Sequence, residues 1–494
     1  MDEINTLVQE RLKKLSALQA EAPSGKAVEP YGRRFDVTHS SQKILEGFEE
    51  GTRVKVAGRL RAIRAHGKTV FADLHDEKGK IQLYLKEEVI GEEAFTFFST
   101  KIDIGDILGA EGTLFKTKTG EASIRAETFQ LLAKSLRPLP EKWHGLKDVE
   151  TRYRQRYVDL LMNQEVRGLF VLRSRLLQEL RGYLDGAGFL EVETPMMHPV
   201  AGGAAGEPFR TYHKALDIDL YMRLAPELYL KKLLVGGFDR VYEIAKSFRN
   251  EGISTQHNPE FTMLEAYAAY WNYEDMMTFV EKMLSTLVEE LVGSTKVTYA
   301  TPKGDLEIDF APPWERFSFS KWMEEKFKIR PNDPREEMIR KLREEGRKQN
   351  LGITVEGNFT RSHIVNLVAD LVTPQTKGRP VFMTDYYTVI SPLAKSRVDN
   401  PEIAERFELF VAGMEIANGY SELNDPIEQR RRFEEQVKEK GEESQIDEDF
   451  LRALEYGMPP AAGLGIGIDR FLMLLANKSS IREVILFPQL KPEK

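Results

Sequence analysis

Gly463-Leu464-Gly465-Ile466-Gly467-Ile468-Asp469-Arg470 alternates glycine with large residues and runs directly into the apolar segment Phe471 to Ala476. Successive side chains of a strand point to opposite faces, so one face of this strand carries no side chains. Glycine inside a strand is typical of a place where another group approaches the backbone closely. The spacing differs from the Gly-x-Gly-x-x-Gly of dinucleotide-binding folds. A flat nucleotide with Arg470 beside it fits the bare face better.

A second stretch places many charged groups between two apolar, strand-like segments. Phe248-Arg249-Asn250-Glu251-Gly252 is followed by His257-Asn258-Pro259-Glu260-Phe261-Thr262-Met263-Leu264-Glu265. Arg249 suits a phosphate or a carboxylate, because its planar guanidinium offers a fork of donors. Phe261 suits stacking on a purine. Either residue alone is also compatible with a purely structural role.

The segment Arg406 to Asn418 is predicted to form two strands joined at Ala412-Gly413. A two-residue hairpin loop makes Glu408 face Ala417 and Phe410 face Glu415, so both carboxylates share one face. The opposite face is then apolar, with Phe407, Leu409, Val411, Met414 and Ile416. Two such carboxylates can hold magnesium against phosphates. The alternative is a pair of solvated glutamates, which the nearby polar residues disfavour: Asn418, Glu422 and Asp425.

The pattern of elements predicts an α+β catalytic domain over residues 152–494. Long helical patterns such as Leu169 to Asp185 and Tyr273 to Val292 mix with strand-like runs, without strict βαβ alternation. That mixture favours an antiparallel sheet flanked by helices over a doubly wound parallel one. Residues 333–350 are predicted to be a helical insertion.

The first third of the chain predicts a separate small β-barrel over residues 52–134. Short β-type runs are separated by turn residues at Gly67, Asp76 to Gly79 and Lys118 to Gly120. An amphipathic helix from Ile4 to Ala20 is expected within a lead-in of residues 1–51. Residues 135–151 are expected to be a linker, because Leu136-Arg137-Pro138-Leu139-Pro140 is stiff and extended.

Composition sets limits on the class of protein. At 494 residues the chain exceeds the size at which one core keeps growing, so at least two domains are expected. The absence of cysteine excludes disulfides, thiolate zinc sites and cysteine nucleophiles. Charged residues interrupt every apolar stretch near the start, and no later run is long enough to span a bilayer. A cytoplasmic protein without a membrane partner is expected.

The net charge of -8 argues against a nucleic-acid partner, but its distribution matters more. Residues 51–72, the basic segment, hold six basic side chains and no acidic one: Arg53, Lys55, Arg59, Arg61, Arg64 and Lys68. On a small barrel, such a face beside Phe71 and Gln82 suits single-stranded nucleic acid. The alternative is a solvated strand face with a core phenylalanine.

These segments resemble the three signature motifs of class II aminoacyl-tRNA synthetases. Motif 1 matches Gly188-Phe189-Leu190-Glu191-Val192-Glu193-Thr194-Pro195, motif 2 matches Phe248 through Glu265, and motif 3 matches Gly463 to Arg470. The resemblance to bacterial lysyl-tRNA synthetases covers nearly the whole chain. It includes Arg152 to Leu160, Ala225-Pro226-Glu227-Leu228-Tyr229-Leu230-Lys231 and Tyr420-Ser421-Glu422-Leu423-Asn424-Asp425.

The resemblance implies lysine–tRNA ligase activity. Such an enzyme activates L-lysine with ATP to lysyl-adenylate, and then transfers lysine to the 3′-terminal ribose of tRNA(Lys), releasing AMP. It implies magnesium, up to three ions per subunit, and a homodimer built on the motif 1 helix and strand. It also implies an N-terminal OB-fold barrel that binds the anticodon, with matching residues at Phe71, Gln82 and Glu121.

The family's catalytic and ATP-binding residues match residue by residue. Arg249 would bind the α-phosphate and the lysine carboxylate, and Phe261 and Arg470 would sandwich adenine. The remaining matches are Glu251, His257 and Asn258 for ATP, and Glu408 and Glu415 for magnesium. Catalysis would rest on Arg249, Glu251 and Arg470.

For the amino acid, Glu227 and Glu422 match the pair that receives the ε-ammonium. The matching pocket is completed by Gly203, Glu265, Tyr267, Asn418 and Tyr420. A neutral or acidic side chain would leave the two carboxylates unpaired and desolvated, which costs several kcal/mol. The chemistry therefore agrees with specificity for a cation.

Four positions depart from the usual family pattern: Glu207, Tyr212, Val389 and Tyr420. Glu207 stands where arginine is common, Tyr212 where histidine is, and Val389 where glutamate is usual. We expect Glu207 and Val389 to affect turnover or selectivity, because they alter charge near segments that approach the active site. Tyr420 in place of phenylalanine is expected to be a mild change.

Three alternatives differ in features that the sequence carries. An aspartyl or asparaginyl synthetase shares the barrel and the motifs, but its pocket should offer cations rather than Glu227 and Glu422. A synthetase-like protein lysyl ligase resembles the catalytic domain alone, without a barrel. An inactive RNA-binding scaffold has no need to keep Arg249 and Arg470 together with the two magnesium carboxylates.

Overall fold

The computed structural model describes residues 2–20, 29–140, 148–204, 206–351, 359–369, 371, 378–440 and 445–493. Residues 21–28 of the predicted lead-in and 141–147 of the predicted linker lie outside this range. The chain divides into two compact units, Met1–Lys147 and Asp148–Lys494. Each unit has a hydrophobic core of its own.

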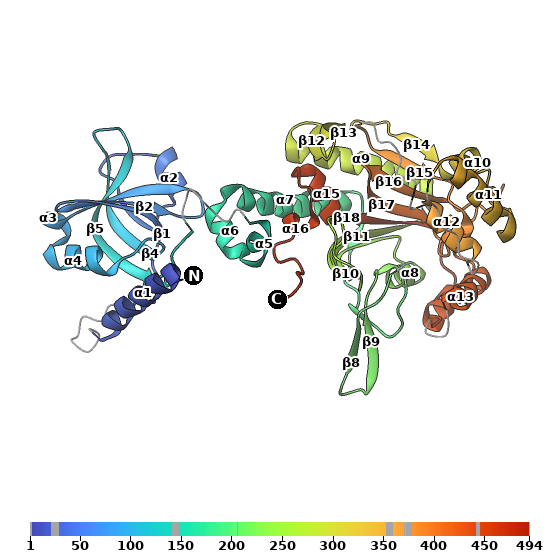
Figure 1. The fold of residues 1–494 in the computed structure, drawn as a ribbon, viewed down its shortest axis with the longest axis horizontal. Coiled ribbons are helices and arrows are strands. Elements are labelled where there is room, and N and C mark those ends of the chain that lie inside the picture. Colours follow the sequence, from blue (N-terminus) through green and yellow to red (C-terminus); the bar gives the residue numbers. More distant parts are fainter. Residues whose placement is uncertain are drawn as a thin grey trace. The chain divides into compact units, whose positions relative to one another are not determined.

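The first unit is a closed five-stranded barrel with the strand order β1-β2-β3-β5-β4 (Figure 1). Its strands are β1 (Arg53–His66), β2 (Thr69–His75), β3 (Lys80–Lys86), β4 (Ile107–Lys116) and β5 (Ala122–Ala133). Alternation fills the barrel, since Val54 and Val56 are buried while Arg53 and Lys55 face outward. Four helices flank it: α1 (Asp2–Ala20), α2 (Ser41–Glu46), α3 (Glu87–Ile90) and α4 (Glu92–Lys101).

Helix α1 is fixed to the barrel by a buried arginine. Arg11 donates to the carbonyl of Ile104 at 2.9 Å and to the carbonyl of Ser135 at 2.9 Å. Beside it, the fully buried Lys134 pairs with Asp103 at 2.6 Å and with Asp106 at 2.7 Å. These contacts hold together the loop before β4 and the segment that leaves β5.

The second unit is built on an eight-stranded sheet with the order β14-β15-β16-β17-β18-β11-β10-β6. The six central strands are antiparallel, and only the edge pairs β14-β15 and β10-β6 are parallel. The bounds are β6 (Leu190–Glu191), β10 (Arg240–Phe248), β11 (Glu260–Ala269), β14 (Glu315–Ser318), β15 (Val381–Thr384), β16 (Arg406–Val411), β17 (Met414–Ser421) and β18 (Ala461–Gly467). The predicted fold class, an OB-type barrel with an antiparallel α+β domain, is confirmed.

Helices α7 (Gln164–Gly186), α9 (Tyr273–Val292) and α15 (Ile468–Leu475) contribute to the main core on this sheet. Helix α9 begins where Asn272 and Asp275 form a reciprocal capping box, and it ends at Gly293 with a left-handed φ of 79°. Its apolar stripe packs against β16, β17 and β18. The predicted passage from the glycine strand into an apolar helix is confirmed by β18 and α15.

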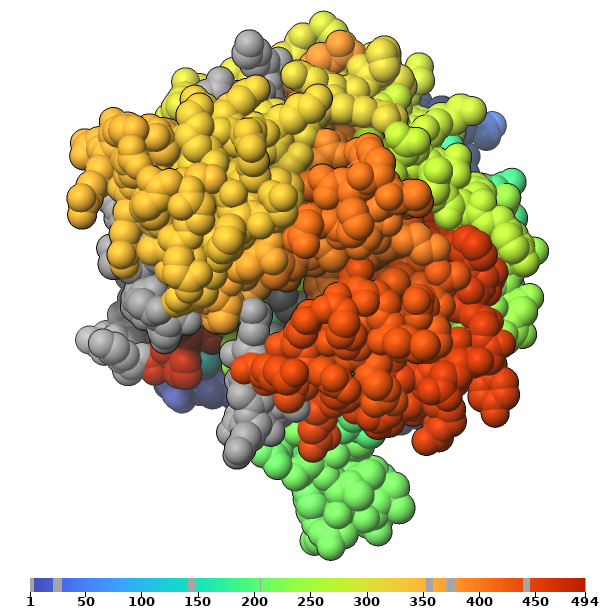
Figure 2. Space-filling model, turned by 90° about the vertical axis from the view of Figure 1, so that its right-hand side faces the viewer, coloured from blue at the N-terminus to red at the C-terminus, as the bar shows by residue number. Residues whose placement is uncertain are grey.

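The remaining elements surround the sheet. They are α5 (Val149–Arg154), α6 (Arg156–Met162), α8 (Glu227–Val235), α10 (Phe319–Phe327), α11 (Arg335–Lys348), α12 (Arg361–Ala369), α13 (Pro426–Lys440), α14 (Glu448–Glu455), α16 (Ile481–Val484), β7 (Met197–His198), β8 (Arg210–His213), β9 (Ile218–Met222), β12 (Lys296–Thr301) and β13 (Gly304–Asp309). Helices α10 and α11 form the yellow surface in Figure 2, and the β8-β9 hairpin projects from this unit as the green tip.

Candidate active site

The bare face of β18 lies under a group of charged side chains. A Cβ on Gly463 would lie 1.9 Å from the Glu422 Oε1 atom and 2.5 Å from the Tyr267 ring. The close approach that the glycine spacing predicts is therefore made at Gly463 by side chains of the chain itself. Only a glycine fits here, because the two side chains occupy the space of a Cβ. The predicted nucleotide beside Arg470, at the other end of this glycine segment, stays a prediction.

Three buried carboxylates converge above this glycine. Glu227 begins helix α8, Glu265 lies on β11 and Glu422 directly follows β17, and they are 5%, 4% and 1% exposed. Tyr267 donates a hydrogen bond to Glu265 at 3.1 Å. Burial, with the Glu227 charge beside it, raises the pKa of Glu265 to about 8. Burial also raises the pKa of Glu422 well above its usual value.

One ammonium group is buried among these carboxylates. The Lys231 Nζ atom lies 2.6 Å from Glu227 Oε1 and 2.5 Å from Glu422 Oε2. Burial opposes its charge, but Glu227 and Glu422 outweigh burial and raise the pKa of Lys231. Sequence reasoning did not single out Lys231. Its spacing of four residues from Glu227 on a predicted helix was the available signal, because such residues share a helix face.

Tyr420 contributes more to the pocket than its mild departure from phenylalanine indicates. Its hydroxyl donates to Glu227 Oε1 at 2.5 Å, a bond that phenylalanine lacks. Gly203, with a left-handed φ of 84°, also lies at the pocket, since a Cβ there would be 3.6 Å from the Glu227 Cβ. The structure thus brings together Gly203, Glu227, Glu265, Tyr267, Tyr420 and Glu422 as one pocket.

Asn418 links this pocket to the predicted magnesium carboxylates. Its side-chain oxygen accepts a hydrogen bond from Arg406 Nε at 3.2 Å. Another nitrogen of the same guanidinium binds Glu408 at 2.6 Å. Arg406 also lies over the Tyr386 ring, 4.6 Å from its centroid. Arg406 is a second positioning residue that sequence reasoning missed.

The motif 2 residues span the end of β10, the loop that follows it and the start of β11. The Arg249 guanidinium is 5.2 Å from the centroid of the Phe261 ring. Among the described residues, no acceptor reaches the buried Arg249 Nε atom. Glu251 lies beside Arg249, since a Cβ on Gly206 would be 3.0 Å from a Glu251 oxygen and 3.3 Å from the Arg249 Cδ. Arg249 therefore retains donor capacity for an anion.

Arg470 and His257 lie together at the start of α15. The Arg470 Nη2 and His257 Nε2 atoms are 3.0 Å apart, and Arg470 Nη1 donates to the Glu415 carbonyl at 2.8 Å. Burial, together with the Arg470 charge, lowers the pKa of His257 and so favours the neutral ring. Asn258 donates to the Glu260 carbonyl at 2.6 Å, and in the described part of the chain its buried Oδ1 atom has no donor.

The hairpin of β16 and β17 agrees with the prediction in part. The pairing of Phe410 with Glu415 is confirmed, and the five predicted apolar residues all lie in the main core. Glu408 pairs with Asn418, however, so its predicted pairing with Ala417 was wrong. The register shifts at Leu409 and Phe410, leaving Ile416 as the extra residue of a β-bulge. A strict two-residue alternation cannot anticipate such a bulge.

Glu408 and Glu415 fit part of a magnesium shell. Burial raises the pKa of Glu408, and Glu415 raises it further, so the two carboxylates interact. No group of three or more potential metal ligands of the His, Cys, Asp or Glu type occurs among the described residues. Magnesium retains several waters and takes further oxygens from substrate phosphates, so two carboxylates are enough protein ligands for it.

A buried ion pair connects helix α7 to the nucleotide side. Arg173 Nη1 lies 2.5 Å from Asp469 Oδ1, and its Nη2 atom donates to the Thr262 hydroxyl at 2.9 Å. Asp469 also accepts from the Thr262 backbone at 2.7 Å. Since these residues adjoin Arg470 and Phe261 in sequence, the network fixes the backbone beneath both proposed adenine contacts.

In the barrel unit, Gln82 and Glu121 form a hydrogen-bonded pair. Gln82 donates to Glu121 at 3.0 Å and accepts from Ser123 at 2.9 Å, and it is 6% exposed. Phe71 lies on the next strand, its ring 5.0 Å from that of Tyr84 and partly exposed. A half-exposed ring beside an amide and a carboxylate suits a base that stacks and hydrogen-bonds.

The basic segment is less free than its sequence indicates. Carboxylates from other parts of the barrel pair with four of its six side chains, in Arg53–Glu111, Lys55–Glu111, Arg64–Asp73 and Lys68–Glu87. The distances run from 2.7 to 3.1 Å. The absence of acidic residues within residues 51–72 therefore does not make the folded surface purely basic.

Two of the departures from the family pattern lie outside these contacts. Tyr212 is on the projecting hairpin and bonds to Asp217. Val389 packs against a separate apolar cluster that includes Tyr386 and Phe410. Glu207 is closer, since its backbone carbonyl accepts from the Asn250 amide at 2.8 Å.

Comparison with known proteins agrees with this geometry. Residues 148–491 match the class II tRNA synthetases (D, K and N), and residues 54–132 match the OB-fold nucleic acid binding domain. The lysine–tRNA ligase of Carboxydothermus hydrogenoformans is 50% identical over 500 residues, covering 99% of both chains. That of Moorella thermoacetica is 50% identical over 497 residues, again covering 99% of both. That of Aquifex aeolicus is 52% identical over 465 residues, or 92% of this chain and 76% of the relative.

Proposed function

This chain belongs to the lysine–tRNA ligases of the class II tRNA synthetases, and on that premise we propose how its residues bind lysine, ATP, magnesium and tRNA. The lysine carboxylate attacks the α-phosphorus of ATP, the bond to the β-phosphate breaks, and pyrophosphate leaves. The terminal ribose hydroxyl of tRNA then attacks the adenylate carbonyl, loses its proton, and releases AMP. These substrates support a cytoplasmic location. Among the described residues, no helix is both long and apolar enough to cross a membrane.

The observation that carries the proposal is the pocket of three buried carboxylates, Glu227, Glu265 and Glu422. The ε-ammonium of lysine would bind between Glu227 and Glu422. An aspartate or asparagine side chain would supply no cation to these carboxylates, whose negative charge Lys231 balances only in part. Uncompensated charge in a desolvated site costs several kcal/mol. The pocket thus supports lysine over the substrates of the aspartyl and asparaginyl members.

Arg249 would hold the lysine carboxylate against the α-phosphate. Its guanidinium, whose buried Nε atom has no acceptor among the described residues, would stabilise the negative charge that develops on the phosphate oxygens during in-line attack. Phe261 and Arg470 would hold the adenine between a ring and a guanidinium. Glu251, His257 and Asn258 would complete the ATP site. No covalent bond to the protein is required, because this arrangement only orients the two reactants and neutralises charge.

Glu408 and Glu415 would hold magnesium, which, when bound, neutralises phosphate charge and assists pyrophosphate as a leaving group. Arg406 keeps Glu408 oriented through their 2.6 Å ion pair. Asn418, bonded to the same arginine, would align the lysine pocket with the metal side.

The barrel would bind the anticodon of tRNA. Phe71 would stack on one base, and Gln82 with Glu121 would hydrogen-bond to its edge. The unpaired edges of single-stranded bases are what such modules read in RNA.

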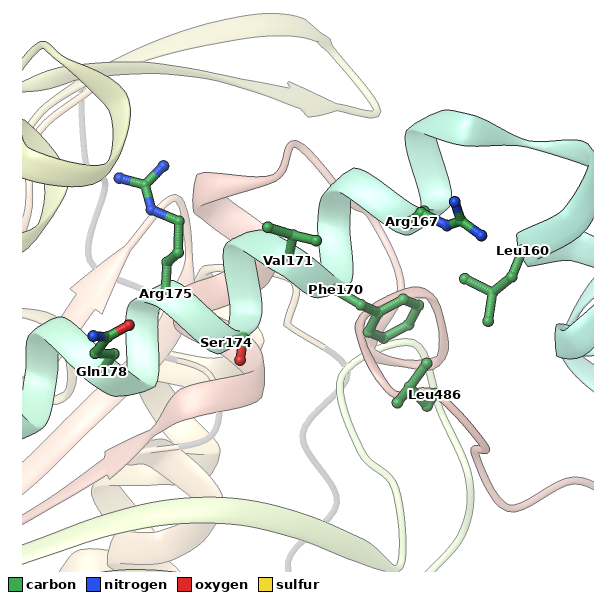
Figure 3. A pocket seen from close by; sticks show the side chains of 8 residues that line it. All are labelled: Leu160, Arg167, Phe170, Val171, Ser174, Arg175, Gln178 and Leu486. Carbon is green, nitrogen blue, oxygen red and sulfur yellow. The ribbon is translucent and has the colours of Figure 1, made fainter. Parts of the chain in front are cut away.

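A homodimer is supported by an apolar groove along helix α7. Phe170, Val171 and Leu486 line it, as Figure 3 shows, and Val171 is 54% exposed. Leu190, on the short strand after this helix, is 48% exposed. A second copy would cover these side chains, and Val171→Asp is expected to convert the dimer to a monomer in sedimentation experiments.

ATP/pyrophosphate exchange with each amino acid, in magnesium and without tRNA, tests the proposal directly. Exchange with lysine alone is expected in the wild type, and Arg249→Ala should abolish it. Lys232→Met is the matched control, because Lys232 lies on α8 but pairs outside the pocket with Asp449. Exchange with aspartate or asparagine instead of lysine would contradict the pocket assignment.

A further inference from the structure

Lys231 belongs to the protein, yet its ammonium lies between the two carboxylates that the proposed function assigns to the substrate ε-ammonium. The inference below rests on that proposed function. The question is whether Lys231 competes with lysine or prepares the site for it. The packing, the contacts and the charge of the pocket all indicate that Lys231 prepares the site.

The packing leaves Lys231 no second position. Its side chain is fully buried, and it lies one turn from Glu227 on α8. The Tyr420 ring centroid is 5.5 Å from its Nζ atom, and the Phe450 ring centroid of α14 is 5.9 Å away. To leave, the ammonium would lose two ion pairs and both rings without reaching water. Leaving a buried charge without its partners is strongly unfavourable, so we expect Lys231 to keep this position when a ligand binds.

Its contacts use only half of each carboxylate. Lys231 binds Oε1 of Glu227 and Oε2 of Glu422. In the part of the chain that the structure describes, no donor reaches the buried Glu422 Oε1 atom, which faces Gly463. A buried carboxylate oxygen without a donor is costly unless a ligand supplies one. The Glu422 Oε1 atom therefore retains the capacity to accept from a second ammonium.

The charge count also matches the substrate. Glu243 is neutralised by Arg223 at 2.7 Å, which leaves Glu227, Glu265 and Glu422 against Lys231. Three carboxylates and one ammonium carry an excess of two negative charges when all are ionised. Lysine brings two ammonium groups, one on its side chain and one on its α-carbon, while its carboxylate is assigned to Arg249 and does not enter this count. Without Lys231 the excess would be three, and a bound lysine would leave one charge unbalanced.

We propose that Lys231 is a specificity-determining positioning residue, which fixes Glu227 and Glu422 with one oxygen each directed to the substrate and matches the pocket's charge to lysine. It does not touch the reacting atoms. Its removal should therefore raise the KM for lysine and weaken discrimination against uncharged analogues, with a smaller effect on kcat.

The test is ATP/pyrophosphate exchange with Lys231→Met, against Lys232→Met as control. Lysine KM should rise at least tenfold in the Lys231 variant, while ATP KM changes less than threefold. The preference for lysine over its uncharged isostere norleucine should fall at least tenfold. The KM–pH curve of the variant should also shift to higher pH, because the carboxylates lose a neighbouring cation. The control should match the wild type in all four measurements.

An unchanged lysine KM in Lys231→Met would overturn the inference, and a lowered KM would show instead that Lys231 competes with the substrate. If Lys231→Met does not fold, Lys231→Gln keeps a donor without the charge and should show the same rise in KM; an unchanged KM there also overturns the inference. If exchange by the wild-type protein does not depend on lysine, the proposed function is contradicted, whatever the Lys231 variants show.

Discussion

The lysine pocket and the barrel surface contrast as recognition sites. The pocket holds carboxylates that are at most 5% exposed, together with a fully buried ammonium. The proposed anticodon site pairs the buried Gln82 with Glu121, whose side chain is 41% exposed, beside a half-exposed Phe71. A buried charge without its partner costs several kcal/mol, whereas an ordinary hydrogen bond contributes about 0.5–1.5 kcal/mol. The pocket should therefore select through a few large energies, and the barrel through several small ones.

The comparison is tested most severely by Glu422→Gln. Truncating one partner of a buried charge pair costs about 2–5 kcal/mol, so kcat/KM for lysine in exchange should fall on the order of a thousandfold. The KM for ATP should stay within about threefold, because Glu422 lies on the lysine side. The measurement is lysine-dependent ATP/pyrophosphate exchange under saturating ATP.

Asp449→Asn supplies the matching control. It makes the same chemical change to an exposed partner of helix α8, paired with Lys232 at 2.7 Å. Its effect on exchange should be less than twofold. Comparable losses in both variants would remove the contrast between buried and exposed charges.

In the barrel, Phe71→Ala should have a smaller effect that is confined to tRNA. Stacking of a base on an aromatic ring contributes about 1–3 kcal/mol, so kcat/KM for tRNA in aminoacylation should fall roughly 5- to 150-fold. Exchange without tRNA should be unchanged. Phe115→Ala, on another barrel strand, serves as the control for loss of an aromatic ring. If exchange falls with aminoacylation, Phe71 acts through folding and not through tRNA.

The pH dependence of lysine binding offers a third test. With a pKa of about 8, Glu265 holds a proton at pH 7 in the free protein. A bound ammonium favours the carboxylate, so lysine binding should release this proton. The KM for lysine should consequently fall about tenfold between pH 6.5 and 8 and then level off. Glu265→Gln should flatten this profile, and a flat profile in the wild type would contradict the assignment.

The raised pKa of Glu265 also affects the stability of the folded state, which it favours at low pH rather than at high pH. The pKa of Glu265 is raised above its ordinary 4.5, so the folded state holds the proton more tightly than the unfolded chain. Its contribution to stability is fully present below pH 4.5 and decreases as the pH rises to about 8. Rising pH thus improves lysine binding while lowering the stability contributed by this one residue.

Sequence patterns predicted the fold because each pattern is local. The alternation in β1, the helical spacing of apolar residues in α9 and the glycines of β18 act within a few residues of one another. The shared face of Glu408 and Glu415 was also predictable from strand periodicity. The bulge at Ile416 was not, because it depends on how β17 pairs with both of its neighbours.

The candidate site was predictable in its residues but not in its balance of charge. The carboxylates of the lysine pocket and of the proposed magnesium site were named from sequence, whereas the cations that pair with them were not. These cations are Lys231, which pairs with Glu227 and Glu422, and Arg406, which pairs with Glu408. In the barrel, sequence reasoning missed the acidic partners of the basic segment, because these carboxylates come from elsewhere in the chain. Counter-ions are tertiary contacts, and a linear count of charges does not contain them.

The smallest expected effect concerns those barrel counter-ions. Glu111 binds Arg53 at 2.9 Å and Lys55 at 3.1 Å, so Glu111→Gln releases one carboxylate's hold on two cations. If these cations face RNA phosphates, the KM for tRNA should fall about two- to threefold in low salt and return to the wild-type value near 0.3 M salt. Glu46→Gln removes the same charge from helix α2, away from these pairs, and controls for net charge.

A salt-independent response, or an equal response in both variants, would mean that Arg53 and Lys55 stabilise the barrel rather than bind tRNA. The cost to folding should be small, because exposed ion pairs contribute little. This effect should be much smaller than the thousandfold loss expected for Glu422→Gln, because Glu422 is buried and Glu111 is not.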